Sequence, residues 1–571
     1  MVFIKYIGLV LALFGIIIGS YFLSISYDSF IATVSDFVSV SSVKGISDPE
    51  GELRSILTPK IFFRIKLFPL LSVIMGVMIF MFASNLDRCA REIVSTWSDI
   101  LADFRLIDKK YLQIAYMVIM AGLITRLYYA SGYPVGYDEA WTYIYFTTRG
   151  FLTSISFYPA PNNHVLNSVL TNLTYYFPFN QTINLRLPSI VIGTVSVFAF
   201  YLTFRRFFND RIALWLVSIF SFLNPMLYYG HKARGYALVT LSFVICFYGA
   251  IQIVKSANSD DIKRYGFYLS FGAVMGLYSQ PSFLYSYFAL TTFLVLTLLC
   301  RRNIKQLKIF FTSVFITGGI TVLLYSPLFI VSGFSAISAN ERVSPIPRVE
   351  VLNLLYGHFA ETARFLFYSE WVLLLVVFLS IFLLMKPRFG SGNGLASYII
   401  YICPIILLLH SVVARPRDWV YLVIPVLFLL GSLMKSLSVD KNEVLLGSSA
   451  IFLMGFLIFN FNTHMKIGEK YAMEADALSS FLVSNHANKI YVNHLVIKTN
   501  LIYLFEEKEA EVELISSRLD PLKDNILTEN NFDFLILGDL VNNIPGYKLI
   551  KKLCVACRWD NKIYIYEQFS P

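Results

Sequence analysis

The stretch GYDEAWTY at residues 136–143 follows an apolar run at residues 111–129 that is long enough to cross a lipid bilayer. It places two adjacent carboxylates, Asp138 and Glu139, one short loop beyond a predicted membrane exit. Acidic residues at a membrane boundary are uncommon without a partner or a function. The stretch therefore predicts a site at one face of the membrane, with Asp138 as its catalytic carboxylate.

The composition is that of a polytopic membrane protein. The chain has 571 residues, of which 56% are hydrophobic and 15% charged, far from the balance of a soluble globular domain. The net charge is +10, but most Lys and Arg residues lie in short loops between apolar runs. This pattern indicates topology rather than nucleic-acid affinity, because a nucleic-acid surface needs clustered charge on a soluble face.

The apolar runs predict about thirteen transmembrane helices, and the basic residues mark alternate loops between them. The 136–143 stretch and the loops around residues 230–235 and 414–418 then share the non-cytoplasmic side. The first run is interpreted as an uncleaved helix rather than a signal peptide, because no convincing small-residue cleavage site follows it. The predicted spans are residues 7–24, 68–83, 111–129, 187–204, 212–229, 236–254, 265–279, 282–300, 309–331, 365–385, 395–412, 419–434 and 444–461.

Three parts of the chain are expected. Residues 1–110 form a two-helix extension and a cytoplasmic segment, residues 111–465 a transmembrane core, and residues 466–571 a small soluble α/β domain on the non-cytoplasmic side. The predicted strands of this domain are residues 489–493, 512–515, 532–537, 548–553 and 563–566. Cys554 and Cys557 form a single C-x-x-C, which is too few ligands for a structural zinc site but compatible with a local disulfide outside the cytoplasm.

Two amphipathic helices are predicted between residues 137 and 178, where no run is apolar enough to cross. In the first, Asp138, Trp141, Thr142 and Tyr145 share a face. The second, at residues 164–177, has an apolar stripe and an opposite polar stripe, so we expect it to lie in the membrane interface with its polar stripe facing an aqueous cavity. The polar stripe consists of His164, Asn167, Ser168 and Thr171.

The two carboxylates have different expected roles. A carboxylate placed between apolar walls and nearby cations can accept a proton from an acceptor hydroxyl, which is the role expected of Asp138. The alternative is a helix N-cap, and the two roles can coexist. Glu139 is the second catalytic candidate, but it points roughly 100° away on a helix and could equally be solvated or paired with an Arg.

Asn163 and His164 open the second amphipathic helix and are candidates for hydrogen bonds to the substrate. The alternative is an interfacial histidine without a role. The remaining histidines are scattered singly along the chain, so the sequence predicts no zinc site.

Two basic clusters lie on the side where positive charge is normally avoided. The first, at residues 230–236, contains His231, Lys232, Arg234 and Tyr236. Arg binds a phosphate through two parallel hydrogen bonds and Lys acts as a point charge, so this cluster predicts an anion site. The alternative is that the basic side chains reach toward lipid head groups.

The second basic cluster is RPRDW at residues 415–419. Arg417 stands next to Asp418 and could form a plain ion pair with it. Arg415 is then the freer candidate for a phosphate. Together the two clusters and the carboxylates suit a substrate with a lipid tail, a phosphate and a polar head group.

The order of these motifs resembles a known superfamily. The matching stretches are the Asp-Glu pair, Asn-Asn-His at 162–164, LRLPS at 185–189, RRFF at 205–208, NPMLYYGHKARGYAL at 224–238 and RPRDWVYLVIP at 415–425. They resemble the membrane glycosyltransferases of the GT-C fold, in particular the superfamily of dolichyl-phosphate-mannose–protein mannosyltransferases and the bacterial aminoarabinose and galacturonic acid transferases. The likeness covers about residues 111–461.

The resemblance implies an α-helical polytopic membrane protein that transfers one sugar, a hexose or a pentose, from a polyprenyl-phosphate carrier to a lipid, glycan or protein acceptor, with inversion. It implies that Asp138 matches the essential acidic residue of the first outer loop, and that Arg234 and Arg415 match basic positions near the carrier phosphate. Two features depart from the family: the two spans before residue 111, and NNHVLN at 162–167 where relatives have a Pro-Pro-Leu-Tyr-Tyr pattern.

No cofactor motif is found, and a divalent cation is left open. The expected partners are the polyprenyl-phosphate-linked sugar, its acceptor and membrane lipids, with no nucleic acid; the expected location is a bacterial inner membrane in the cell envelope. Two other functions remain as alternatives. A transporter or flippase of lipid-linked sugars would need charged residues along a path through the spans, and a noncatalytic glycan-assembly partner would bind through its soluble domain.

Overall fold

The computed structural model describes residues 2–40, 54, 57–81, 83–84, 87, 91, 98, 102, 104–256, 258–339, 343–385, 390–516, 531–541, 544–556 and 561–568. Most of the predicted cytoplasmic segment before residue 104 lies outside these residues. So does Cys557, one half of the predicted disulfide.

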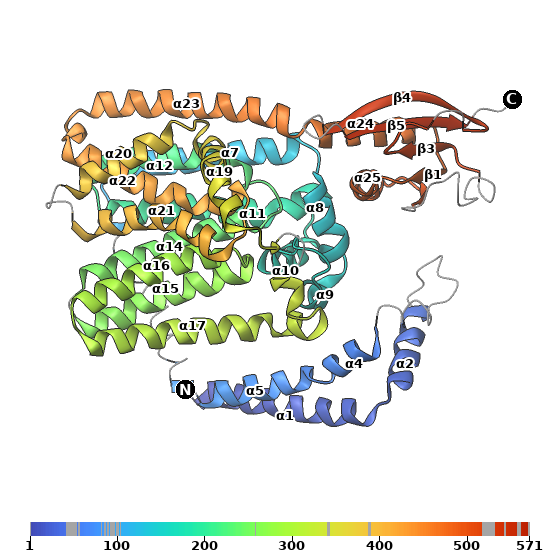
Figure 1. The fold of residues 1–571 in the computed structure, drawn as a ribbon, viewed down its shortest axis with the longest axis horizontal. Helices are drawn as coiled ribbons and strands as arrows, with labels where there is room; N and C mark the ends of the chain where they lie inside the picture. The colour runs from blue at the N-terminus through green and yellow to red at the C-terminus, as the bar shows by residue number, and fades with distance from the viewer. Residues whose placement is uncertain are drawn as a thin grey trace.

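The centre of the molecule is a bundle of long helices that run roughly side by side (Figure 1). The bundle helices are α7 (Lys109–Gly132), α11 (Gln181–Arg205), α12 (Asp210–Phe222), α14 (Tyr236–Lys255), α15 (Ser259–Ser279), α16 (Phe283–Cys300), α17 (Ile304–Val331), α20 (Val372–Leu384), α21 (Gly390–His410), α22 (Val423–Ser436) and α23 (Glu443–Gly468). The segments between them contain the 20-residue helix α19 (Arg348–Phe367) and the short elements α13 (Asn224–Tyr228), α18 (Ser335–Ser338), the 3-10 turn η4 (Pro416–Leu422) and η5 (Val439–Lys441). The predicted fold class, a helical polytopic membrane protein, is confirmed.

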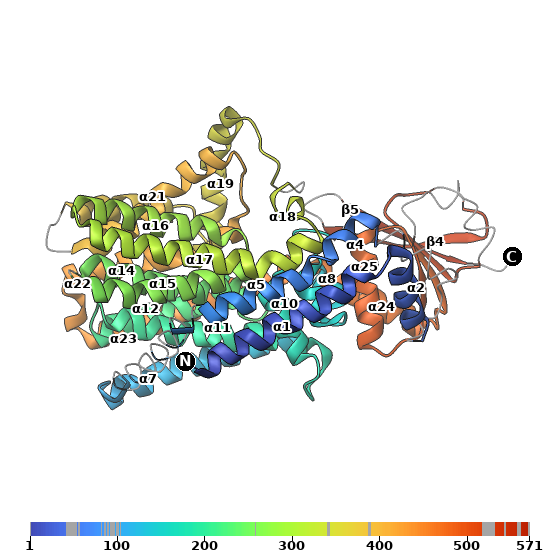
Figure 2. The same ribbon diagram turned by 90° about the horizontal axis from the view of Figure 1, so that it is seen from below.

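Fewer described helices than the predicted thirteen are long and apolar enough, each by itself, to cross a membrane. Among the described residues, ten helices are long and apolar enough to cross a membrane, or eleven if α19 and α20 count as one broken span. Of the predicted thirteen, α12 is only 13 residues long, and α15 begins with charged residues that shorten its apolar part. The remaining predicted span, at 365–385, is split because α19 ends at Tyr368 in a left-handed conformation (φ 63°), and α20 then leaves at an angle of 91°. Figure 2 shows α19 projecting from the bundle.

The two N-terminal spans form a hairpin beside the bundle (Figures 1 and 2). It consists of α1 (Val2–Ser24), α2 (Tyr27–Val40), α4 (Pro59–Ile65) and α5 (Phe68–Met81). Helices α1 and α5 approach so closely that a Cβ atom on Gly76 would lie 2.8 Å from the Cα atom of Ala12. Small residues at such a contact let helix backbones meet, which stabilises helix pairs in lipid.

Four short elements cover one end of the bundle: α8 (Tyr137–Thr142), the π-helical turn η1 (Tyr143–Thr147), α9 (Gly150–Ser156) and α10 (Val165–Thr174). The prediction that the polar stripe of the second amphipathic helix faces a cavity is wrong. Asn167, Ser168 and Thr171 are buried, and Thr171 bonds the hydroxyl of Thr147 at 2.8 Å. Leu173 on the apolar stripe is exposed instead, as expected for a helix whose outer face meets lipid.

The C-terminal residues form a five-stranded mixed sheet in the order β2-β1-β3-β5-β4, at the same end of the bundle as α8 and α10 (Figure 1). Strand β1 pairs in parallel with β2 and β3, whereas β5 is antiparallel to β3 and β4. All five predicted strands are confirmed: β1 (Lys489–Val492), β2 (Glu513–Ile515), β3 (Phe534–Leu537), β4 (Tyr547–Ala556) and β5 (Asn561–Gln568). Two helices accompany the sheet, α24 (Lys470–Ser484) and α25 (Leu495–Glu507).

The sheet domain is joined to the membrane bundle by a shared core. Ala140 of α8 and Leu185 of α11 are buried in one apolar cluster with Leu501 and Leu504 of α25. At its edge, the Tyr143 hydroxyl donates a hydrogen bond of 2.7 Å to Oε1 of Glu506. The C-terminal domain therefore helps to hold α8, the helix that carries Asp138.

A buried arginine within a span was not anticipated from the sequence. Arg126 of α7 is 1% exposed, and its Nη2 donates hydrogen bonds of 3.3 Å to the carbonyl oxygens of Ser221 and Met226. These carbonyls lie at the break between α12 and α13, so Arg126 fixes the chain just before the basic cluster at 230–236. Gly230 packs directly on the guanidinium, since a Cβ atom there would overlap Arg126 Nε and the Met226 carbonyl oxygen.

The Gly230→Ala variant is expected to destabilise the protein by about 1–3 kcal/mol, because the added methyl group must displace a backbone carbonyl or the buried arginine. The measurement is the unfolding temperature of the detergent-purified protein. Gly318→Ala in α17 is the matched control, because a Cβ atom there meets no atom within 4 Å. Equal unfolding temperatures for the two variants would show that the contact is not tight.

Candidate functional site

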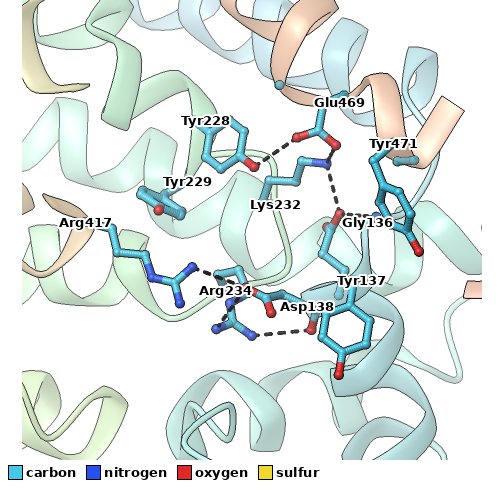
Figure 3. Close-up of a pocket in the computed structure, with 13 residues that line it drawn as sticks. Gly136, Tyr137, Asp138, Tyr228, Tyr229, Lys232, Arg234, Arg417, Glu469 and Tyr471 are labelled. Atoms are coloured by element: carbon cyan, nitrogen blue, oxygen red, sulfur yellow. Dashed lines mark hydrogen bonds and ion pairs between the residues drawn. The ribbon is translucent and has the colours of Figure 1, made fainter. Parts of the chain in front are cut away.

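A cavity of about 220 Å³ opens at the end of the bundle where the C-terminal domain is attached. Its walls come from residues 136–139 at the start of α8, from the segment 228–234, from Arg417 of η4 and from the junction at 468–472 between α23 and α24. Figure 3 shows Asp138, Arg234 and Arg417 pointing toward one another within it. The structure thus brings the predicted carboxylate and basic residues of both clusters into one hollow.

Asp138 faces two guanidinium groups. Its Oδ2 accepts a hydrogen bond of 3.2 Å from Arg417 Nη1 and lies 3.7 Å from Arg234 Nη2. The Asp138 side chain is 34% exposed, whereas Arg234 is 4% exposed. The carboxylate is therefore reachable from the cavity, while Arg234 is held rigidly behind it by a 2.5 Å hydrogen bond to Oδ1 of Asn162.

Glu139, unlike the accessible Asp138, is buried and fully engaged by neighbouring groups. Its two oxygens accept hydrogen bonds from Arg186 Nε at 2.9 Å and Nη2 at 2.7 Å, and Oε1 accepts a third from the backbone N–H of Ala233 at 2.8 Å. Burial alone would raise the pKa of Glu139, but the charges of Arg186 and Lys232 and the hydrogen bonds outweigh it and hold that pKa well below its ordinary value. Glu139 is thus an ionised anchor, the Arg-paired alternative that the sequence left open, rather than a group poised to exchange a proton.

Arg186 connects the parts of the site. Besides Glu139, its guanidinium donates to the carbonyl oxygens of Ala130, Tyr133 and Pro134 at 2.7–3.1 Å. All five N–H bonds of the guanidinium are therefore used. The loop between α7 and α8 is fixed in this way, and with it the position of Asp138.

Lys232 lines the cavity, but its ammonium group is already paired with two carboxylates. Its Nζ lies 3.2 Å from Oε2 of Glu139 and 2.8 Å from Oε2 of Glu469. Oε1 of Glu469 accepts a hydrogen bond of 2.9 Å from the Tyr228 hydroxyl. Lys232 therefore ties the end of the last span to α8, and it is less available to a phosphate than the sequence suggested.

The second basic cluster is arranged differently from the prediction. Arg417, not Arg415, lines the cavity. The oxygens of Asp418 accept hydrogen bonds from Gln280, from Ser282 and from the Arg415 backbone, whereas Arg417 donates its hydrogen bond to Asp138. The reason is the 3-10 turn η4, in which successive side chains point about 120° apart and Arg417 alone is turned toward Asp138. The Arg415 side chain is exposed.

Asn163 and His164 do not line the cavity. The Asn163 amide donates to the carbonyl oxygens of Ser154 and Phe157 and stabilises the loop before α10. His164 is buried with its ring 5.2 Å from that of Tyr236. Its pKa is held well below the usual value by burial and by the charges of Arg234 and Arg417, so the imidazole is neutral.

The other two predicted binding residues also lie behind the site. His231 is fully buried between aromatic rings that include Tyr129 and Phe461, which makes it a core histidine. Tyr236 supports Arg417, whose guanidinium carbon lies 5.9 Å from the Tyr236 ring centroid, within the range of a cation–π contact.

Several residues of the site were missed, among them Arg186, Asn162, Glu469 and Tyr471. Arg186 could have been found, because it stands directly before a predicted span on the side where Arg is unusual. Glu469 and Tyr471 follow the last span in an unremarkable sequence and enter the cavity only because α23 ends beside α8. Among the described residues, no group of three or more His, Cys, Asp or Glu side chains could hold a metal ion.

Comparisons with known proteins add a structural similarity. No protein-family model matches the chain, and no curated protein matches it in sequence. Among solved structures, the chain is similar to ArnT from Cupriavidus metallidurans, both in the apo state and bound to undecaprenyl phosphate. In both comparisons the identity is 11%, the TM-score is 0.49, and the match covers 80% of this chain and 97% of ArnT.

Proposed function

We propose that this protein is an integral membrane glycosyltransferase. It moves a single sugar from a polyprenyl-phosphate donor to a lipid, glycan or protein acceptor, with inversion at the sugar carbon. The observation that carries the proposal is the accessible Asp138 carboxylate opposite Arg417 and Arg234 in one cavity at the end of a membrane-spanning bundle.

Each group in the cavity suits one part of the reaction. An oxygen of the acceptor hydroxyl attacks the anomeric carbon as the bond from that carbon to the phosphate oxygen breaks. Asp138 takes the proton of the attacking hydroxyl. The polyprenyl phosphate leaves with the bonding electron pair, and the guanidinium groups of Arg417 and Arg234 stabilise the charge that develops on it. Attack from the face opposite the leaving phosphate inverts the configuration.

The proposal extends to location. The protein resides in a bacterial inner membrane, with the cavity and the C-terminal domain on the non-cytoplasmic side. The start of α8, which lines the cavity, and the C-terminal domain lie at the same end of the bundle (Figure 1). This supports a reaction at a single membrane face, as a substrate with a lipid tail requires.

A comparison of cells with and without this chain tests the proposal. Lipid-linked sugars and envelope glycans are extracted from both and compared by mass spectrometry. Loss of one sugar from an acceptor, together with accumulation of its polyprenyl-phosphate form, is the expected result. Movement of labelled polyprenyl-phosphate sugar across liposomes containing the purified protein, with no sugar transferred, would instead favour a flippase.

The Arg417→Lys variant is expected to lower kcat/KM for sugar transfer roughly 10- to 100-fold. Lys keeps the charge but cannot bind a phosphate through two parallel hydrogen bonds or stack on Tyr236. The assay is single-sugar transfer by the protein in nanodiscs. Arg415→Lys is the comparison. A larger loss of kcat/KM for Arg415→Lys than for Arg417→Lys would show that Arg415 binds the phosphate, as the sequence predicts.

A further inference from the structure

The segment that carries Asp138 also carries a row of aromatic side chains. Tyr137, Trp141 and Tyr145 follow one another at intervals of four residues along α8 and η1. The ring centroids of Tyr137 and Trp141 lie 5.9 Å apart with an edge-to-face orientation, and those of Trp141 and Tyr145 lie 4.3 Å apart in a stacked orientation. We call these three residues the aromatic row.

The aromatic row begins in the cavity and extends beyond it. Tyr137 lines the cavity together with Asp138, and the other two rings continue from it. All three rings are half-buried. Ala140 and Tyr143, on the opposite face of the same segment, are buried in the core shared with the C-terminal domain. The segment is therefore held by one face, while the other carries Asp138 and the aromatic row.

The proposed chemistry fixes the side from which an acceptor approaches Asp138. When the donor phosphate lies on Arg417 and Arg234, the attacking oxygen must lie on the far side of the anomeric carbon, because the configuration is inverted. Figure 3 shows Arg417 and Tyr137 on opposite sides of Asp138. An acceptor whose hydroxyl reaches Asp138 from that side meets the start of the aromatic row.

We infer that the acceptor is a glycan and that the aromatic row is the surface on which its sugar rings pack. This inference rests on the proposed function and names the acceptor class. The C–H groups of a sugar ring form an apolar face that packs on the negative face of an aromatic ring, while the sugar hydroxyls stay in water. Half-buried rings that contact one another lose little conformational freedom when a ligand binds, which favours binding.

Aromatic side chains that face lipid are exposed differently in this structure. Tyr128 on α7 is 65% exposed and Tyr176 after α10 is 83% exposed, as expected of an interfacial aromatic belt. The aromatic row is half-buried instead, and it leads to the carboxylate that accepts the proton. A polypeptide acceptor would call for hydrogen-bonding groups along its backbone rather than for a row of rings.

The first test locates the transferred sugar. Glycans, lipids and proteins of the envelope are separated from cells with and without this chain, and the position of the missing sugar is determined by methylation analysis and mass spectrometry. The expected position is a hydroxyl of another sugar residue. A sugar missing from a Ser or Thr side chain, or from a lipid without sugars, would overturn the inference and leave the glycosyltransferase proposal standing. No missing sugar in any fraction would overturn both.

The second test separates ring stacking from apolar packing. Tyr145→Phe keeps an aromatic ring and Tyr145→Leu does not, and Trp141→Tyr and Trp141→Leu form a second pair of this kind. Each full-length variant is expressed at the same low level in cells that lack the chain, and the initial rate at which the missing sugar returns is measured. Trp371→Leu, where the indole is 71% exposed, is the matched control.

The two Leu variants of the row are expected to restore the sugar about three- to tenfold more slowly than the wild type, the effect of losing one aromatic stacking contact. The variants that keep a ring are expected to stay within about twofold of the wild-type rate, because a smaller aromatic face still packs on a sugar. The control is expected to restore the sugar at the wild-type rate.

Binding of undecaprenyl phosphate to the purified variants in nanodiscs shows whether the cavity is intact. Every variant is expected to bind it with wild-type affinity, because Arg417 and Arg234 hold the phosphate on the other side of Asp138. A parallel loss of this binding, or equal slowing of the Leu variants and the variants that keep a ring, would overturn the inference, because the row would then only support the fold of α8. Leu variants as fast as the wild type would overturn it as well.

Discussion

Replacing Asp138 with Asn is expected to lower the rate of sugar transfer about 10²- to 10⁴-fold, the usual contribution of a positioned general base. Asn has nearly the same shape as Asp and can still accept a hydrogen bond from Arg417, so the cavity should keep its form. It cannot take the proton of the acceptor hydroxyl. The loss should therefore appear in kcat, while binding of the donor lipid changes little.

Single-turnover transfer by the protein in nanodiscs measures this effect, with donor binding followed separately. Asp260→Asn is the matched control, because Asp260 pairs with Lys263 in an exposed position. The competing explanation is that Asp138 only orients the two guanidinium groups. In that case Asp138→Asn would weaken donor binding and kcat together, and an undiminished rate would remove Asp138 from the mechanism.

The second large effect is expected from Glu139→Gln, which should reduce the free energy of unfolding by about 3–5 kcal/mol. Gln preserves the shape of Glu but not its charge. Arg186 would then be a buried guanidinium, 0% exposed, without a counter-charge. Transfer activity should fall as a consequence, because Arg186 also fixes the loop that positions Asp138.

The pH dependence of the stability difference shows whether the charge of Glu139 is its cause. The pKa of Glu139 is held below its ordinary value of 4.5 in the folded protein. Its charge therefore stabilises the folded state at every pH above the ordinary pKa, and this contribution is lost as the pH falls through the lowered pKa of the folded state. The difference in unfolding temperature between wild type and Glu139→Gln should therefore persist from pH 8 down to about pH 5. Glu350→Gln, at an exposed position on α19, should unfold like the wild type throughout. A difference that vanishes by neutral pH would contradict this assignment.

Much of the architecture could be predicted from local patterns. The long apolar runs of α7, α11, α14 and α23 identify membrane helices because lipid leaves no other conformation for an apolar segment of that length. The strands β1 to β5 were found from alternating or continuous apolar runs between polar breaks. The span count failed where a local rule was not sufficient, as at Tyr368, whose left-handed conformation ends α19 and is not visible in composition.

The site was predicted as a set of positions but not as an arrangement. The alternation of spans and basic loops predicts that Asp138, Lys232, Arg234 and Arg417 lie at one membrane face. Their contacts could not be predicted and came from the packing of the helices: Arg417 rather than Arg415 faces Asp138, and Glu139 is paired with Arg186. The physical reason is that the side of the membrane follows from the order of segments, whereas the direction of a side chain follows from the turn that carries it and from the helices packed around it.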